Sequence, residues 1–219
     1  MEINHPKAYD TLAKDTLLVS AIISTLFGIL YFLGLTGKLI VNGSIHATSS
    51  PVINMISGGI GLLWDSTLVI MFAALRRLSR GRKSFFADLG LVFMILMAAC
   101  SSINWYVQLT LIPRIIQSGN VVMVDLLDIH RVNSLMYSME HLGWGLFYGL
   151  AAIFMAITFE DGKIDTWIRW LMIAGGVMSI LFIPGIMVNN IFLIDLGYYA
   201  AGVLLPITTL LLVIRFRKY

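Results

Sequence analysis

A single carboxylate, Asp65, interrupts the run of apolar residues from Val52 to Leu75. Insertion scales give an ionisable side chain at membrane depth a cost of roughly 2.5–3.5 kcal/mol, so such a residue is a functional hypothesis by default. The other apolar runs contain no Lys or Arg that could neutralise it. We therefore expect Asp65 to be protonated at neutral pH. Two interpretations stay open: a hydrogen bond that joins helices, or a contact to a proton, cation or substrate.

Two further pairs of polar residues lie in apolar surroundings. Glu140 and His141 are adjacent near the start of the run Leu135–Phe159, and on a helix they project about 100° apart, so they cannot simply pair with each other. They are either interfacial side chains that reach water or contacts to a ligand. Asn104 and Gln108 are one turn apart and share one helix face.

These polar side chains are expected in the outer half of the molecule, with little but interfacial charge in the inner half. We therefore expect an outward-facing polar crevice that ends near Asp65. Its candidate contacts for a small molecule, an ion or a lipid are Asp65, Asn104, Gln108, Glu140 and His141.

Motifs for other chemistries are absent from the sequence. It contains no HExxH, no Cys/His pair with zinc-site spacing and no G-x-S-x-G nucleophile elbow. We therefore expect neither a metal nor a cofactor, and the sequence assigns no catalytic residue.

The composition restricts the class of protein that could position these residues. Apolar residues make up 58% of the 219 residues and charged residues only 12%, about half the share in an ordinary soluble domain. A charged shell this thin could not cover the apolar surface of a soluble protein. A soluble enzyme, a disordered chain and a nucleic-acid binder are thus excluded, and a multi-pass membrane protein remains.

The apolar runs predict the fold. A membrane-crossing helix needs about 20 apolar residues. Six runs meet this requirement, so we expect an all-α bundle of six transmembrane helices that forms one integral membrane domain over residues 1–219. The predicted spans cover residues 17–35, 52–75, 89–112, 135–159, 170–188 and 196–214.

Basic residues predict the orientation of the spans. If the N-terminus is cytoplasmic, 12 of the 15 Lys and Arg residues lie in inside segments and only Lys38, Arg114 and Arg131 lie outside. Such an excess is the positive-inside pattern, and an even number of spans returns the C-terminus to the cytoplasm. The longest loop, residues 113–134, is then on the outside.

The third and fourth runs carry a resemblance. Their segments are INWYVQLTLIPRI (residues 103–115) and HRVNSLMYSMEHLGWGLFYGLAAIFMAITF (residues 130–159). Together with the following helix they resemble a loose group of uncharacterised prokaryotic multi-pass membrane proteins. The resemblance covers roughly residues 100–217, and Trp105, Gln108 and Glu140 match the pattern of the group, whereas His141 departs from it. It implies a six-helix topology and a prokaryotic cell membrane, but no activity.

Three functions stay open at this stage. The first is a membrane protein with a crevice for a ligand or ion, in a transport, sensor or accessory role. The second is a membrane-embedded enzyme that acts on a lipid or isoprenoid, with Asp65 or Glu140 as general acid. The third is a structural subunit of a membrane complex. The bilayer is the expected partner, nucleic acid is not, and the sequence leaves the oligomeric state open.

Overall fold

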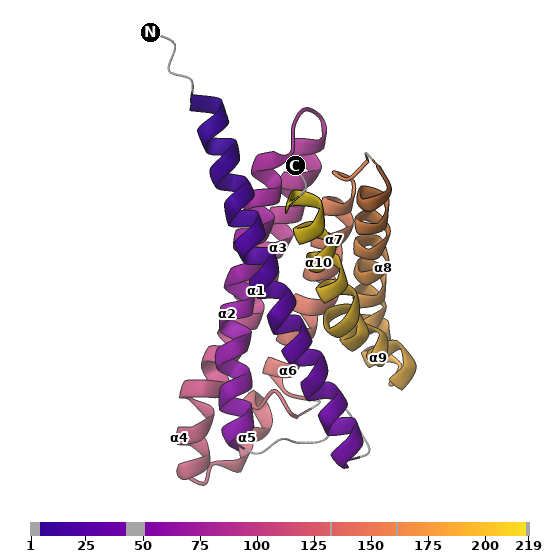
Figure 1. The fold of residues 1–219 in the computed structure, drawn as a ribbon. Helices are drawn as coiled ribbons and strands as arrows, with labels where there is room; N and C mark the ends of the chain where they lie inside the picture. Colours follow the sequence, from indigo (N-terminus) through magenta and orange to yellow (C-terminus); the bar gives the residue numbers. More distant parts are fainter. Residues whose placement is uncertain (1–4, 43–50, 132, 161, 218–219) are drawn as a thin grey trace.

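The computed structural model describes residues 5–42, 51–131, 133–160 and 162–217. Regular structure in this part of the chain is entirely helical (Figure 1). The elements are α1 (His5–Asn42), α2 (Pro51–Leu78), α3 (Lys83–Thr110), α4 (Ile112–Gln117), α5 (Val121–Leu127), α6 (Leu135–His141), the π-helical segment η1 (Leu142–Phe147), α7 (Tyr148–Ala156), α8 (Gly162–Met187), α9 (Ile191–Tyr199), the π-helical segment η2 (Ala200–Leu204) and α10 (Leu205–Arg217).

Among the described residues, five helical stretches are long and apolar enough to cross a membrane. They are Asp10–Gly34, Ile56–Leu78, Lys83–Gln117, Gly162–Met187 and Ile191–Arg217. The fourth predicted span, residues 135–159, is not among them. It forms the consecutive segments α6, η1 and α7, in which the polar Glu140 and His141 and three glycines lower the hydropathy. The structure therefore bears out the all-helical membrane architecture and leaves the sixth span as a prediction.

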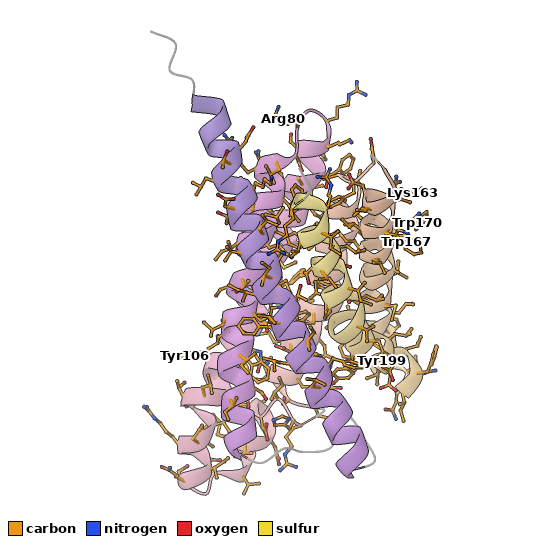
Figure 2. All side chains as sticks on the ribbon, in the orientation of Figure 1. Arg80, Tyr106, Lys163, Trp167, Trp170 and Tyr199 are labelled. Atoms are coloured by element: carbon orange, nitrogen blue, oxygen red, sulfur yellow. The ribbon has the colours of Figure 1, made fainter. Side chains whose placement is uncertain are left out.

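Successive long segments run up and down the bundle (Figure 1). The start of α1, the α2–α3 turn and the end of α10 lie at one end, which we call the basic end. The helices α4 and α5 lie at the opposite end, which we call the loop end. Figure 2 shows Arg80 and Lys163 at the basic end, with Trp167 and Trp170 close by on α8.

Ion pairs connect neighbouring elements at the basic end. Arg215 on α10 forms a two-pronged pair with Asp165 on α8, whose side chain is only 5% exposed. Three more exposed pairs are Arg76–Asp88, Arg80–Asp10 and Lys83–Glu160. Lys83 also holds the pKa of Glu160 below its ordinary value, because it donates a hydrogen bond to the carboxylate and attracts it.

Glycines let α7 and α8 cross in close contact, as small residues do between helices in lipid. A Cβ atom on Gly149 would lie 2.7 Å from the carbonyl oxygen of Gly176, and one on Gly176 would lie 2.6 Å from that of Gly149. Gly145, one turn before Gly149, packs on Ile183 of α8 in the same way. The Gly145–Gly149 pair thus packs η1 and α7 against α8.

Several predicted boundaries need correction. Four of the six predicted runs lie within longer helical stretches, because helices continue into polar flanks that are not themselves apolar. The run of residues 170–188 passes the end of α8 at Met187 by one residue. The run predicted to end at Phe159 leaves the helix at Ala156, and residues 157–158 form a turn. The loop of residues 113–134 contains two short helices, α4 and α5.

Candidate functional site

The predicted residue Glu140 lies between α6 and α3 and is held by side chains of α3. Asn104 Nδ2 donates a hydrogen bond of 2.8 Å to Glu140 Oε2, and the hydroxyl of Ser101 lies 3.3 Å from Oε1. Trp144 Nε1 in turn donates to Ser101 Oγ at 3.2 Å. Ser101 and Asn104 are both fully buried and Glu140 itself is half-buried, so the polar groups that hold this carboxylate lie inside the protein.

Asp65 adjoins this group from α2. It is fully buried and lies near the middle of the Ile56–Leu78 stretch. Ser102 Oγ lies 3.5 Å from Asp65 Oδ2, Ser101 also faces the carboxyl group, and Asp65 interacts electrostatically with Glu140. Its second oxygen, Oδ1, has no hydrogen-bond partner among the described residues. We call Asp65, Ser101, Ser102, Asn104 and Glu140 the carboxyl cluster.

In the described part of the chain, the hydrogen-bond donors to the two carboxyls are the neutral side chains of Ser101, Ser102 and Asn104. Besides Asp65, Tyr31 of α1, Cys100 of α3 and Tyr198 of α9 interact electrostatically with Glu140. None of these groups carries positive charge. The donors available to the two carboxyls are therefore neutral, and a second negative charge in this cluster would be uncompensated.

Gln108 lies beyond Asn104 toward the loop end and holds the loop by both ends of its amide. Its Nε2 donates to the carbonyl oxygen of Leu127 at 2.8 Å, and its Oε1 accepts from the backbone N–H of Ile129 at 3.3 Å. The same Nε2 lies 3.4 Å from Asn104 Oδ1. Gln108 thus lies further toward the loop end than Asn104 and connects α3 to the segment that precedes α6.

His141 is not part of the carboxyl cluster. Its Nδ1 pairs with the carbonyl oxygen of Tyr137, and its ring stacks on Phe182 of α8 with 4.3 Å between centroids. The side chain is buried, and Nε2 has no hydrogen-bond partner among the described residues. His141 therefore faces α8, while the adjacent Glu140 faces α3, as expected for helix neighbours about 100° apart.

The π-helical segment η1 begins directly after these two residues. A π turn contains an extra residue, and such turns are frequent at functional sites. Trp144 in this segment reaches Ser101 on α3, while Gly143 packs on Cys100 and Gly145 packs on Ile183 of α8. The segment thus contacts α3 on one side and α8 on the other. A second π turn, η2, precedes Pro206, whose ring would clash with the carbonyl of Gly202 in a regular helix.

An aromatic wall, Tyr31, Trp64, Trp144 and Tyr148, lies beside the cluster. Neighbouring ring centroids are 5.8 Å apart for Tyr31 and Trp64, and 5.4 Å apart both for Trp64 and Trp144 and for Trp144 and Tyr148. Sequence analysis missed this wall and also missed Ser101. The available signal for Ser101 was its position three residues before Asn104, on the same face of an otherwise apolar helix.

Two shallow grooves mark the described surface, and neither contains Glu140, Asn104, Gln108 or His141. One, of about 350 Å³, runs between α1 and α2 near the basic end. The other, of about 420 Å³, lies between α2 and α3 and ends at Ser102, beside Asp65. The predicted outward crevice remains a prediction.

Comparisons with known proteins give no relative. No family model matches the chain, and neither a curated protein nor a solved structure is significantly similar to it. The resemblance of residues 100–217 to a prokaryotic membrane group therefore remains a prediction.

Proposed function

We propose that this chain is a multi-pass integral membrane protein of a prokaryotic cell membrane that takes up and releases a proton at the Asp65–Glu140 carboxyl pair, in a transport or sensing role. The observation that carries the proposal is that the two carboxyls meet adjacent hydroxyls of α3: Ser101 Oγ lies 3.3 Å from Glu140 Oε1, and Ser102 Oγ lies 3.5 Å from Asp65 Oδ2. Two carboxylates at close quarters in a poorly solvated site do not both ionise without a compensating charge. The pair therefore holds at least one exchangeable proton or an equivalent cation.

The proposed topology has six membrane segments and both termini in the cytoplasm. Two features support it: the segment α6–η1–α7 runs beside α3 and α8 for 22 residues, and it returns the chain from the loop end to the basic end (Figure 1). The exposed Trp167 and Trp170 lie toward the basic end, and Tyr106 and Tyr199 lie nearer the loop end (Figure 2), as aromatic side chains at two membrane interfaces would. A cytoplasmic reporter fused after Tyr219 should be active, and activity of a periplasmic reporter there would contradict this topology.

Infrared difference spectroscopy tests the proton site. Between pH 5 and pH 9 the purified protein should lose a protonated-carboxyl band that is absent from Asp65→Asn or from Glu140→Gln. Asp88→Asn is the matched control, since Asp88 is an exposed carboxylate paired with Arg76 and should leave the band unchanged. Tyr31, Cys100 and Tyr198 also face the pair, so the assignment depends on the carboxyl band and not on total proton release. Two carboxylates that stay ionised at pH 5 would refute the proposal.

One observation favours a second candidate, an enzyme that acts on a lipid or isoprenoid. The groove between α2 and α3 is open at the surface, is lined mostly by apolar side chains and ends at Ser102, next to Asp65. An apolar chain in this groove would bring its polar end to a carboxyl group, where a protonated Asp65 could act as general acid. Conversion of a labelled membrane lipid by the wild type, lost in Asp65→Asn, would support this candidate over the first.

A further inference from the structure

We propose that the carboxyl cluster is a binding site for a desolvated Na⁺ ion, which competes with the exchangeable proton. This inference deepens the proposed function, because it names a second ligand for the same carboxyl pair. The proposed ligands are Asp65, Ser101, Ser102 and Glu140. All four supply oxygen atoms, and these are the ligands that hard cations select.

The spacing of the oxygen atoms supports an ion rather than hydrogen bonds alone. A hydroxyl that donates to a carboxylate normally lies about 2.5–2.7 Å from it. Here Ser101 Oγ is 3.3 Å from Glu140 Oε1, and Ser102 Oγ is 3.5 Å from Asp65 Oδ2. Na⁺ has nearly the radius of Ca²⁺, whose oxygen ligands lie at about 2.3–2.6 Å, so ligands at right angles around such an ion are about 3.4 Å apart.

A second observation points to a ligand independently of this spacing. Asp65 is fully buried, yet its Oδ1 lacks a hydrogen-bond partner in the described part of the chain. A buried acceptor without a donor costs about 1–3 kcal/mol, and more when it carries charge. A cation bound at Oδ1 removes this cost and also neutralises one of the two carboxylates. No basic group among the described electrostatic neighbours of Asp65 removes this cost or neutralises a carboxylate.

The donor set favours Na⁺ over other metal ions. Among the described residues, no three His, Cys, Asp or Glu side chains lie together as a metal-binding group, and the cluster offers neither sulfur nor imidazole to a transition metal. Ca²⁺ takes six to eight oxygens, and Mg²⁺ is dehydrated reluctantly. Moving a divalent ion into a poorly solvated site also costs far more than moving a monovalent one, because the Born energy grows with the square of the charge.

Ion-dependent stability of the purified protein tests the inference. In detergent at constant ionic strength, replacing choline chloride with NaCl should raise the midpoint of thermal unfolding, and KCl should not. Ser102→Ala removes one proposed ligand from the edge of the cluster and should raise the half-saturating Na⁺ concentration about tenfold, as loss of a group that supports a metal site does. Ser66→Ala is the matched control: this α2 hydroxyl lines the same groove but donates to the Leu62 carbonyl. It should leave the Na⁺ response unchanged.

Infrared titration separates this inference from the proposed function. Na⁺ should shift the loss of the protonated-carboxyl band to lower pH, because the ion and the proton compete for the same oxygens. A band that titrates with no effect of Na⁺ on band or stability would refute the sodium site and leave the proton site. Na⁺-dependent stability with both carboxylates ionised from pH 5 to pH 9 would refute the proton site and leave the sodium site. An equal loss of response in Ser66→Ala, or saturation by micromolar Ca²⁺, would also refute the sodium site.

Discussion

Replacing Gly176 with alanine should force α7 and α8 apart, whereas replacing the adjacent Gly175 should not. The added Cβ atom at position 176 would lie 2.6 Å from the carbonyl oxygen of Gly149 and 2.7 Å from Ile153 Cγ1. At position 175 the nearest atom would be 3.7 Å away, an ordinary van der Waals contact. Both positions lie within α8, so both variants gain helix propensity of about 1 kcal/mol. This gain cancels when the two variants are compared.

The comparison therefore isolates the steric cost. Overpacking of this kind costs typically 1–3 kcal/mol, so the free energy of unfolding of Gly176→Ala should be about 1–3 kcal/mol below that of Gly175→Ala. Reversible unfolding by SDS in mixed micelles, followed by tryptophan fluorescence, measures the difference. The clash is with a backbone carbonyl, which cannot rotate away as a flexible side chain can. Equal stability of the two variants, or a more stable Gly176→Ala, would refute the close crossing of α7 and α8.

Two further predictions concern the two ends of the bundle. Asp165→Ala leaves the Arg215 guanidinium of α10 without its partner in a largely buried pair. Since that guanidinium keeps some solvent contact, the free energy of unfolding should fall by about 2–3 kcal/mol. In the same SDS assay, Asp10→Ala, which breaks the more exposed pair with Arg80, should lower it by about 0–1 kcal/mol. Gln108→Leu removes the hydrogen bonds to Leu127 and Ile129 in the loop. It should speed hydrogen exchange of the Ile129 amide about fivefold, which corresponds to the loss of a hydrogen bond of about 1 kcal/mol. Gln117→Leu, at an exposed position, should leave this exchange rate unchanged. Equal effects within either pair would contradict the contacts described.

Much of the architecture was predictable because it depends on composition. Scarce charge and long apolar runs leave helices as the way to satisfy the backbone in lipid. In the residues that the structure describes, regular structure is all-helical and five stretches are long and apolar enough to cross a membrane. Asp65 and Glu140 were identifiable for the same reason, since a carboxyl group in an apolar run is costly and therefore conspicuous. The segment of residues 135–156 was harder to classify, because Glu140, His141 and its glycines weaken the hydropathy signal that defines a span.

Only the tertiary structure decided which polar residues meet. In a soluble helix the apolar face marks the core, but in lipid both the buried face and the outer face are apolar, so sequence carries little information about helix rotation. Rotation here follows from backbone packing, as where Gly149 and Gly176 meet, and from the π turn that begins at Leu142. These features direct Glu140 toward Ser101 and Asn104, while His141 is directed toward Phe182. The sequence by itself predicted carboxyl groups inside the bundle, and packing between helices decided that two of them meet the adjacent hydroxyls of Ser101 and Ser102.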